Sequence, residues 1–245
     1  MAKIFITGSA DGLGQLSANA LVNQGHDVVL HARNAARGRE ALKKVEGASH
    51  VLTGDLSSME ETKNLADQVN ALGVFDAVIH NAGVYQTAAK EIFAINTIAP
   101  YLLTCLIQKP KRLVYLSSGM HLQGRANLDS FKTNINRISY SDSKLHVLML
   151  CMAVAHEWTG VYSNAVDPGW VPTRMGGQGA PDDLEKGYET QTWLAVSDDD
   201  HAKVNGRYLY HRKEKRHNPE ADDVMLRERF LKVCHEVTGI PFPRR

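Results

Sequence analysis

The chain has 245 residues, of which 43% are hydrophobic and 22% charged, and its formal net charge is +1 at pH 7. This composition is typical of an ordinary globular protein, and the small net charge gives no field of one sign that would steer the chain onto nucleic acid or an anionic membrane. The longest apolar run, 147–155, is too short for a membrane span.

Short β-rich runs alternate with helix-periodic stretches from the amino terminus onward. Met1 leads directly into the run KIFIT without a signal peptide, so we expect a cytoplasmic protein. The pattern predicts strands at 3–7, 27–32, 49–53, 75–80, 112–117, 162–166 and 206–210. It predicts helices at 13–25, 37–45, 55–72, about 90–108, 140–158, 190–196 and about 219–238. Near-continuous apolar strands separated by helices indicate one α/β domain over 1–245, a doubly wound parallel sheet of the Rossmann type with helices on both faces.

Several side chains are expected to lie on the inner faces of these helices. In the first helix the apolar face is Leu13, Leu16, Ala20 and Leu21, and in the last it is Leu226, Phe230, Val233 and Val237. The cysteines, Cys105, Cys151 and Cys234, fall in predicted helices and lack metal-ligand spacing. We therefore expect buried, reduced thiols and no metal site.

A glycine-rich turn, TGSADGLG at 7–14, joins the first strand to the first helix. In a doubly wound fold this turn is where a pyrophosphate binds. Gly8 permits a tight exit from the strand, and Gly12 and Gly14 let the backbone approach a phosphate at the helix N-terminus. The spacing differs from the G-x-G-x-x-G fingerprint, and a glycine-rich turn that only connects two elements is the alternative.

Polar motifs also follow the third and fourth strands: Asp55 lies in TGDLSS, and HNAG ends at Gly83. With them the sequence resembles the short-chain dehydrogenase/reductase family, whose members carry T-G-x-x-x-G-x-G and N-A-G at these places. The resemblance extends over essentially the whole chain and includes NTIAP, LVYLSSG, YSDSK and DPGWVPT. The SSGMH segment and the long loop after it are similar to the retinol-dehydrogenase-like branch.

The end of the second strand, LHARN, offers Arg33 and no carboxylate. An arginine there pairs with the 2′-phosphate of NADP, so NADP(H) is favoured over NAD(H), although Asp11 stands where NADP-preferring relatives often have a basic residue. The resemblance implies cofactor contacts from Gly8, Ser9, Asp11, Gly12, Leu13, Gly14, Arg33, Asp55, Leu56, Asn81, Ala82, Gly83, Tyr140, Lys144, Pro168, Gly169, Val171 and Thr173.

Tyr140 and Lys144 lie four positions apart, so on a helix they share one face. A nearby ammonium lowers the pKa of a tyrosine and makes it a usable acid or base, and a polar helix end is the alternative explanation. The resemblance implies a catalytic set in which Ser118 holds the substrate oxygen, with Ser117 as the other candidate. It also implies that Asn96 supports a proton relay to Lys144.

The region 170–200 is expected to form a substrate loop, with Trp170 and Met175 as pocket candidates. Trp193 is a pocket candidate with helical spacing, which favours the core instead. His121 either faces the substrate or is a solvated or capping histidine, and the latter is favoured. The basic run HRKEKRH at 211–217 is read as a solvated turn, with anion binding as the alternative.

The leading hypothesis is an enzyme that transfers a hydride between NADP(H) and a small-molecule carbonyl or alcohol, with no nucleic-acid partner. The alternative is a regulatory protein that senses NADP(H) without turnover. A sugar-nucleotide epimerase is disfavoured because only about 70 residues follow DPG. The helices at 90–108 and 140–158 either pair in a homodimer, as in relatives, or stay covered.

Overall fold

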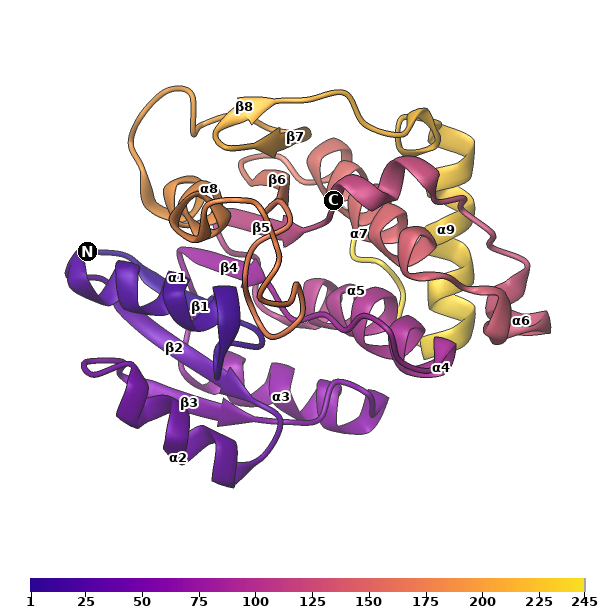
Figure 1. The fold of residues 1–245 in the computed structure, drawn as a ribbon. Helices are drawn as coiled ribbons and strands as arrows, with labels where there is room; N and C mark the ends of the chain where they lie inside the picture. The colour runs from indigo at the N-terminus through magenta and orange to yellow at the C-terminus, as the bar shows by residue number, and fades with distance from the viewer. Residues whose placement is uncertain (245) are drawn as a thin grey trace.

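The computed structural model describes residues 1–244 and is built around one eight-stranded sheet with the order β3-β2-β1-β4-β5-β6-β7-β8 (Figure 1). The strands are β1 Lys3–Ile6, β2 Asp27–Ala32, β3 His50–Thr53, β4 Ala77–His80, β5 Arg112–Leu116, β6 Tyr162–Asp167, β7 Arg207–Tyr210 and β8 Lys213–Glu214. All neighbours pair in parallel except β7 and β8, which are antiparallel. The strand order reverses between β1 and β4, the place where doubly wound sheets bind ligands.

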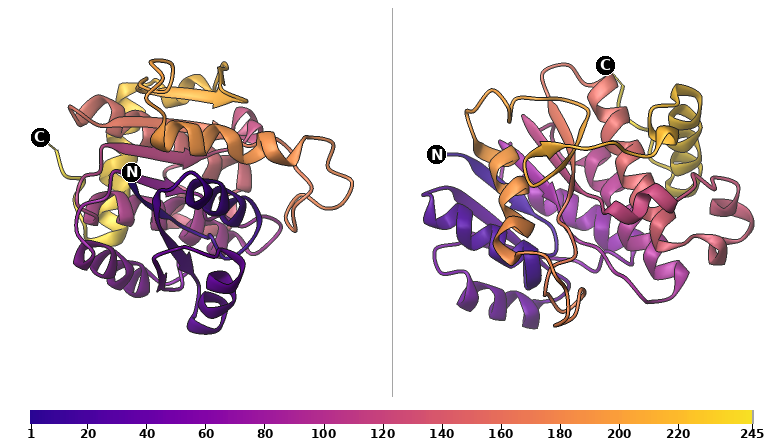
Figure 2. Two further views of the ribbon diagram at one scale, coloured as in Figure 1. Left: turned by 90° about the vertical axis from the view of Figure 1, so that its left-hand side faces the viewer. Right: turned by 45° about the horizontal axis from the view of Figure 1, so that its top comes forward.

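Helices connect the strands and cover both sides of the sheet (Figure 2). The α-helices are α1 Gly12–Asn23, α2 Ala35–Lys44, α3 Met59–Ala71, α4 Ala89–Ile92, α5 Ala99–Leu106, α6 Ser130–Thr133, α7 Tyr140–Glu157, α8 Leu184–Val196 and α9 Val224–Thr238. The other helical segments are η1 Phe93–Ile98, which is π-helical, and the 3-10 turns η2 Gly119–Gln123, η3 Ile135–Arg137 and η4 Pro219–Ala221. The predicted doubly wound α/β fold is confirmed.

Alternate residues of the buried strands point into two separate cores. Ile4 and Ile6 of β1 pack in the core that includes Ala18 of α1, while Phe5 packs in the core that includes Leu148 of α7. Successive side chains of a strand point to opposite faces, so a strand buried on both sides must be apolar throughout. For this reason the strand sequences are apolar along nearly their whole length.

The C-terminal helix α9 packs along α7, on the side away from the sheet (Figure 1). Every residue of α7 from Asp142 to Val154 is buried. A helix buried on all sides needs neighbours on all sides, and here strands β5 and β6 and helix α9 supply them. The chain itself therefore covers the outer face of α7.

The helix expected at about 90–108 is interrupted, because α4 and α5 are separated by the π-helical η1. Pro100, in the first turn of α5, has no backbone N–H and removes one hydrogen-bond donor from this turn. The missing N–H of Pro100 is the physical reason that the helical hydrogen-bond pattern changes before it. π-Helical turns are frequent at functional sites.

Two helix starts differ from the prediction. The helix expected from 190 begins at Leu184, because the side chain of Asp183 accepts a hydrogen bond from Lys186 N and caps it. The helix expected from 219 begins at Val224, where Asp223 is the cap, and the turn η4 precedes it.

The strand predicted to be the last is followed by β8, which the sequence analysis missed. His211 and Arg212 form the connecting turn with φ values of 49° and 60°. Such a turn favours glycine or asparagine, so these two residues gave no turn signal.

The inner face of α1 also differs from the prediction. Its buried positions are Gly14, Ser17, Ala18 and Leu21, so of the four residues expected there only Leu21 is fully buried. Small residues at these positions let α1 lie close to its neighbours α8 and β2.

Cys105, Cys151 and Cys234 are free thiols in helices, as expected, and the first of them is only partly buried. Among the described helices, none combines the length and the apolar character needed to cross a membrane.

Candidate active site

A cleft of about 680 Å³ lies at the carboxyl edge of the sheet, where the loops after β1 to β6 meet. Because all these strands are parallel, their carboxyl ends share one edge, and the predicted motifs converge there. The predicted site residues that line the cleft are Gly8, Asp11, Gly12, Leu13, Arg33, Asp55, Leu56, Asn81, Ala82, Gly83, Ser117, Tyr140, Lys144, Pro168 and Thr173. Those outside its lining are Ser9, Gly14, Asn96, Ser118, Gly169 and Val171.

The glycines of the first turn have different roles. Gly8 has φ of 63°, and a Cβ there would lie 2.9 Å from Ala82 Cα. A Cβ at Gly14 would lie 2.5 Å from Gly8 O and against Asn81 Nδ2, so the helix can approach the loop only with glycine at this position. Gly12 has φ of 54°, and a Cβ there would meet nothing within 4 Å. Its backbone thus faces open space at the N-terminus of α1, as anion binding requires.

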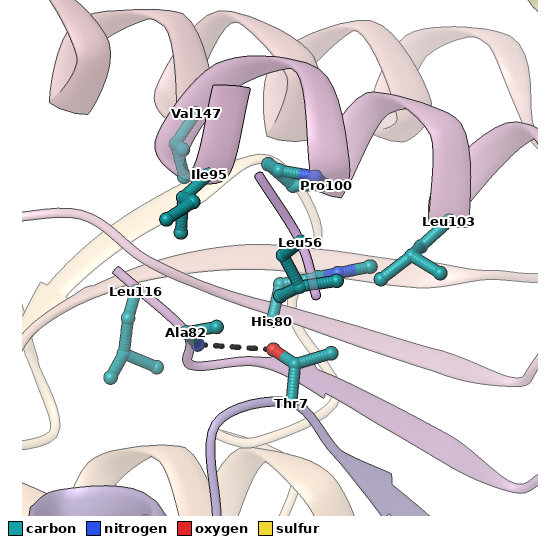
Figure 3. Close-up of a pocket in the computed structure, with 9 residues that line it drawn as sticks. All are labelled: Thr7, Leu56, His80, Ala82, Ile95, Pro100, Leu103, Leu116 and Val147. Atoms are coloured by element: carbon teal, nitrogen blue, oxygen red, sulfur yellow. Dashed lines mark hydrogen bonds between the residues drawn. The ribbon is translucent and has the colours of Figure 1, made fainter. Parts of the chain in front are cut away.

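The segment after β4 holds this turn in place. Asn81 Nδ2 donates to Thr7 O at 2.9 Å and to Gly8 O at 3.2 Å. Thr7 Oγ1 accepts from the backbone N–H groups of Asn81 and Ala82, each at 3.0 Å; Figure 3 shows the bond to Ala82. The cavity drawn in Figure 3 has a volume of about 10 Å³ and is far smaller than the cleft. Asn81 therefore stabilises the conformation of the glycine turn.

His31, at the end of β2, also supports the glycine turn and was missed in the sequence. Its Nδ1 accepts from Gly8 N at 2.9 Å, so Nε2 carries the proton and donates to Gly54 O at 2.9 Å. Burial lowers the pKa of His31 to about 4, which keeps it neutral. Ser9 is fully buried beside it, where its Oγ accepts from His31 N and donates to Ile6 O. Ser9 thus fixes the turn from inside.

Two arginines reach the cleft near the end of β2. Arg33 is exposed, and Arg37, in the first turn of α2, forms an ion pair with Asp11 at 2.6 Å. Asp11 therefore does not leave an uncompensated negative charge in the glycine turn. Arg37 was missed because its distance from the strand end does not match a motif. Asn34 caps α2 by accepting from Arg37 N, so the helix begins close to the end of β2.

The first turn of α7 fixes Tyr140 and Lys144. Ser139 and Asp142 form a capping box, with Asp142 N donating to Ser139 Oγ and Ser139 N donating to Asp142 Oδ2. Lys144 is buried, its Nζ donates to Leu116 O at 2.8 Å, and this atom lies 5.5 Å from the centroid of the Tyr140 ring. The structure thus brings the two residues to one place at the cleft.

The pKa values of this pair differ from the sequence-based expectation. Burial raises the pKa of Tyr140 to about 12, although a hydrogen bond with the Ser118 side chain opposes the shift. Burial lowers the pKa of Lys144 to about 8, against the attraction of Asp167. The pKa of Tyr140 is therefore raised and not lowered as expected, because burial disfavours the phenolate.

The two serines after β5 have different surroundings. Ser117 is buried, and its Oγ donates to Lys144 O at 2.9 Å, which is a structural contact. The side chain of Ser118 opposes the rise in the pKa of Tyr140, and its Oγ accepts from Met120 N at 3.3 Å. Of the two, only Ser118 affects the pKa of the tyrosine hydroxyl.

Asn96 lies in η1, and its side chain is buried and fully hydrogen-bonded. Its Oδ1 accepts from Val84 N at 2.8 Å, and its Nδ2 donates to Val84 O and to Ser143 Oγ, each at 3.0 Å. A Cβ at Gly83 would lie 3.3 Å from Lys144 Nζ and 3.4 Å from Asn96 Oδ1. Asn96 and Lys144 therefore flank the backbone of Gly83.

The predicted substrate loop borders the cleft. Met175 lines it and is half exposed, whereas Trp170 is 60% exposed and its indole N–H donates to Gly176 O at 2.8 Å. Val171 is buried next to Gly187 of α8. Trp193 is buried in the core, as its helical spacing indicated.

Two further predictions near this edge have clear outcomes. His121 is completely buried and is therefore not a solvated histidine. The run 211–217 contains β8 and is mostly exposed, and its Arg212 pairs with Glu189 at 2.8 Å. The reading of the run as a turn with charged, exposed side chains agrees with this arrangement.

Comparisons with known proteins agree with this architecture. A family model described as short chain dehydrogenase matches residues 2–183. The chain is 44% identical over 256 residues to an uncharacterized oxidoreductase of Emericella nidulans, with 99% of both chains covered. It is 24% identical over 283 residues to human retinol dehydrogenase 13, covering 98% of this chain and 85% of that protein.

Among solved structures, an uncharacterized protein of Mycobacterium paratuberculosis has a TM-score of 0.81 at 22% identity, with 99% of this chain and 95% of that chain covered. A Shigella flexneri protein described as a short chain dehydrogenase, solved as a complex with NADP, has a TM-score of 0.67 at 22% identity, with 86% and 97% covered. These two likenesses concern the fold.

Proposed function

Because the chain belongs to the short-chain dehydrogenase/reductase family, with a retinol-dehydrogenase-like relationship, we propose that it transfers a hydride between NADP(H) and a carbonyl or alcohol of a small molecule. The observation that carries this proposal is the arrangement of three side chains, of which Tyr140 and Lys144 line the cleft and Ser118 lies outside its lining. The Ser118 side chain opposes the rise in the pKa of Tyr140, and Lys144 Nζ lies 5.5 Å from the centroid of the Tyr140 ring. Reduction of a carbonyl requires an acid that gives the proton, a charge that stabilises the resulting anion and a hydrogen-bond donor to the carbonyl oxygen.

Each of the three side chains has a role in this proposal. A pKa of about 12 keeps Tyr140 protonated near neutral pH, so its Oη carries the proton that a carbonyl oxygen takes up, and release of this proton needs a positive charge nearby. The Ser118 hydroxyl holds that oxygen by a hydrogen bond. Lys144 supplies this charge: its Nζ lies 5.5 Å from the centroid of the Tyr140 ring, and it stabilises the phenolate that forms when the proton leaves. In the opposite direction Tyr140 takes the proton from an alcohol.

The cleft residues fit a nicotinamide dinucleotide. The open backbone at Gly12 and the N-terminus of α1 suit a pyrophosphate, and Asp55, Leu56, Asn81, Ala82 and Gly83 line the cleft beyond it. Gly8 shapes the turn, and Pro168 and Thr173 border the other end. A nicotinamide cofactor bound there supplies or accepts the hydride.

Arg33 and Arg37 favour NADP(H) in this proposal. Both line the cleft near the end of β2, and a guanidinium pairs well with a 2′-phosphate. No carboxylate ends β2 to bind the ribose hydroxyls of NAD. The NADP complex of the Shigella flexneri protein supports this preference by likeness of fold.

The test follows the oxidation of NADPH and NADH with a panel of ketones, aldehydes and quinones. We expect turnover that prefers NADPH and falls by about 10²-fold or more in Tyr140→Phe, the loss typical of a missing general acid. Tyr162→Phe, an exposed tyrosine outside the cleft, is the matched control. Undiminished turnover in Tyr140→Phe would refute the mechanism.

The same experiment separates the enzyme from a regulatory NADP(H) sensor. Tight binding of NADPH without turnover of any compound in the panel would favour the sensor. The meeting of Ser118, Tyr140 and Lys144 supports the enzyme, because a sensor does not require a proton donor. A cytoplasmic location stays a prediction. So does a homodimer, which would need a face other than the one that α9 covers.

A further inference from the structure

The turn that carries Ser118 is tied from behind by side chains outside the cleft. After β5 the chain passes through Ser118 into the 3-10 turn η2 and ends that turn at Gly124. His121, in the middle of η2, does not line the cleft and is completely buried. A fully buried imidazole needs hydrogen-bond partners for both ring nitrogens, and the two partners here fix its chemical state.

His121 has a single tautomer in this arrangement. Its Nδ1 lies 2.7 Å from Ser118 O, which can only accept, so Nδ1 is the donor. Its Nε2 lies 3.2 Å from Asn218 N, which can only donate, so Nε2 is the acceptor. Both bonds exist only in the neutral ring with its proton on Nδ1. Burial lowers the pKa of His121 and favours this neutral form.

Asn218 holds the same turn from the other side. This residue follows β8 and is buried, and its Nδ2 donates to His121 O at 3.2 Å and to Gly124 O at 2.9 Å. With the bond from its backbone N–H, Asn218 makes three contacts to one short turn. The segment between β8 and α9 is thereby joined to the loop after β5.

The ring of His121 also packs against a fixed aromatic side chain. Its centroid lies 4.5 Å from that of Tyr208, whose hydroxyl donates to Asp167 Oδ2 at 2.9 Å. The other oxygen of Asp167 accepts from Gly169 N at 3.0 Å. Asp167 lies at the end of β6 and beside Gly119, where a Cβ would be 3.0 Å from Oδ2. Ring, hydroxyl and carboxylate thus form one packed unit behind Ser118.

We propose that His121 is a positioning residue for Ser118, which it holds by its hydrogen bond to the Ser118 carbonyl. This carbonyl shares a peptide plane with Ser118 Cα, so fixing the plane restrains the position of the Cα atom from which the serine side chain projects. The inference rests on the proposed function, because its consequence is the aim of the Ser118 hydroxyl toward Tyr140 and the substrate oxygen.

Two conservative variants separate the two bonds of the ring. In His121→Asn the amide nitrogen replaces Nδ1, so the bond to Ser118 is kept and the acceptor for Asn218 is lost. In His121→Gln the amide group reaches the place of Nε2, so the acceptor for Asn218 is kept and the side-chain bond to Ser118 O is lost, while the backbone N–H of residue 121 still donates to Ser118 O, at 3.0 Å in the wild type. A displacement of a catalytic group by about 1 Å can cost about 10²-fold in rate. We expect His121→Gln to lower kcat by about tenfold or more, and His121→Asn to keep kcat within about threefold of the wild type while its Tm falls.

A second background shows whether the effect passes through Ser118. In Ser118→Ala there is no hydroxyl to aim, so adding His121→Gln should lower kcat no further. Asn218→Ala removes the two side-chain bonds to the turn and leaves the backbone bond to Nε2. It should lower kcat in the same direction and have no effect in the Ser118→Ala background, and it serves as the test if His121→Gln does not fold. The dissociation constant of NADPH should stay unchanged in every variant, and His235→Gln, on the exposed side of α9, is the control.

An equal loss of kcat from His121→Gln in the wild-type and Ser118→Ala backgrounds would overturn the inference. So would equal kcat values for His121→Asn and His121→Gln. Tyr140→Phe separates these results from a failure of the proposed function. If Tyr140→Phe abolishes turnover while His121→Gln does not change it, only the positioning role is wrong. If Tyr140→Phe remains active, the proposed mechanism is wrong.

Discussion

His146 is a neutral histidine in the core, and its protonation should destabilise the fold in mild acid. Its Nε2 donates to Ala126 O at 2.7 Å, Thr97 Oγ1 lies 3.1 Å from its Nδ1, and its ring stacks on Phe230. The ring is completely buried, and burial lowers its pKa to about 4. Since an unfolded histidine has a pKa of about 6.5, the unfolded chain takes up the proton first as pH falls.

The size of this effect follows from the two pKa values. Its contribution to stability is complete above pH 6.5 and is lost as pH falls toward 4. At pH 5 the loss is about 2 kcal/mol, and the full loss is about 3 kcal/mol, at 1.36 kcal/mol per pKa unit. The pKa values of His31 and His80 are lowered to about 4 and about 3 by burial, so they add losses of the same sign. A typical domain has only about 5–15 kcal/mol of stability, so this loss is large.

The assay is urea unfolding at pH 7.5 and pH 5.0, followed by circular dichroism, for the wild type and His146→Gln. Glutamine does not titrate, and its amide can still donate to Ala126 O. We expect the free energy of unfolding of the variant to change between the two pH values by about 2 kcal/mol less than that of the wild type. His235→Gln, at an exposed position, is the control and should follow the wild type. Parallel pH profiles for His146→Gln and the wild type would refute the reasoning.

Two further predictions concern the cleft. Arg37→Ala should raise the KM for NADPH about tenfold with little change for NADH, because one charge-assisted hydrogen bond to a 2′-phosphate is worth about 1.5 kcal/mol or more. Arg39→Ala, at an exposed position on the same helix, is the control. An equal rise of KM for both cofactors in steady-state kinetics would contradict this role of Arg37. Reductase activity should decline as pH rises above about 8, where Lys144 loses its charge; a rate that keeps rising to pH 10 would speak against it.

The strands and the cleft motifs were predictable because each depends on neighbours in sequence. A buried parallel strand is apolar along its whole length, and a turn with positive φ at its first and second glycines shows these residues in the sequence. Parallel strands place the ends of TGSADGLG, TGDLSS and HNAG at one edge, so the convergence of these motifs followed from the fold class.

The supports of the site depend on contacts between distant residues. His121 and Asn218 are separated by 97 positions, and local sequence gives no sign that they meet. His31 was read only as part of a strand, although its ring joins the turns at Gly8 and Gly54. The pKa of Tyr140 also depends on burial by segments far along the chain, which is why the expected lowering by lysine was wrong.

By itself, the sequence determined the order of strands and helices, the glycine turn and the pairing of Tyr140 with Lys144 on one helical face. The tertiary structure decided which serine affects the pKa of the tyrosine, that Arg37 pairs with Asp11, and that α9 covers α7. The physical reason is the range of the interactions. Backbone conformation and hydrophobic period are local, whereas burial, hydrogen-bond partners and pKa values depend on everything that packs around a group.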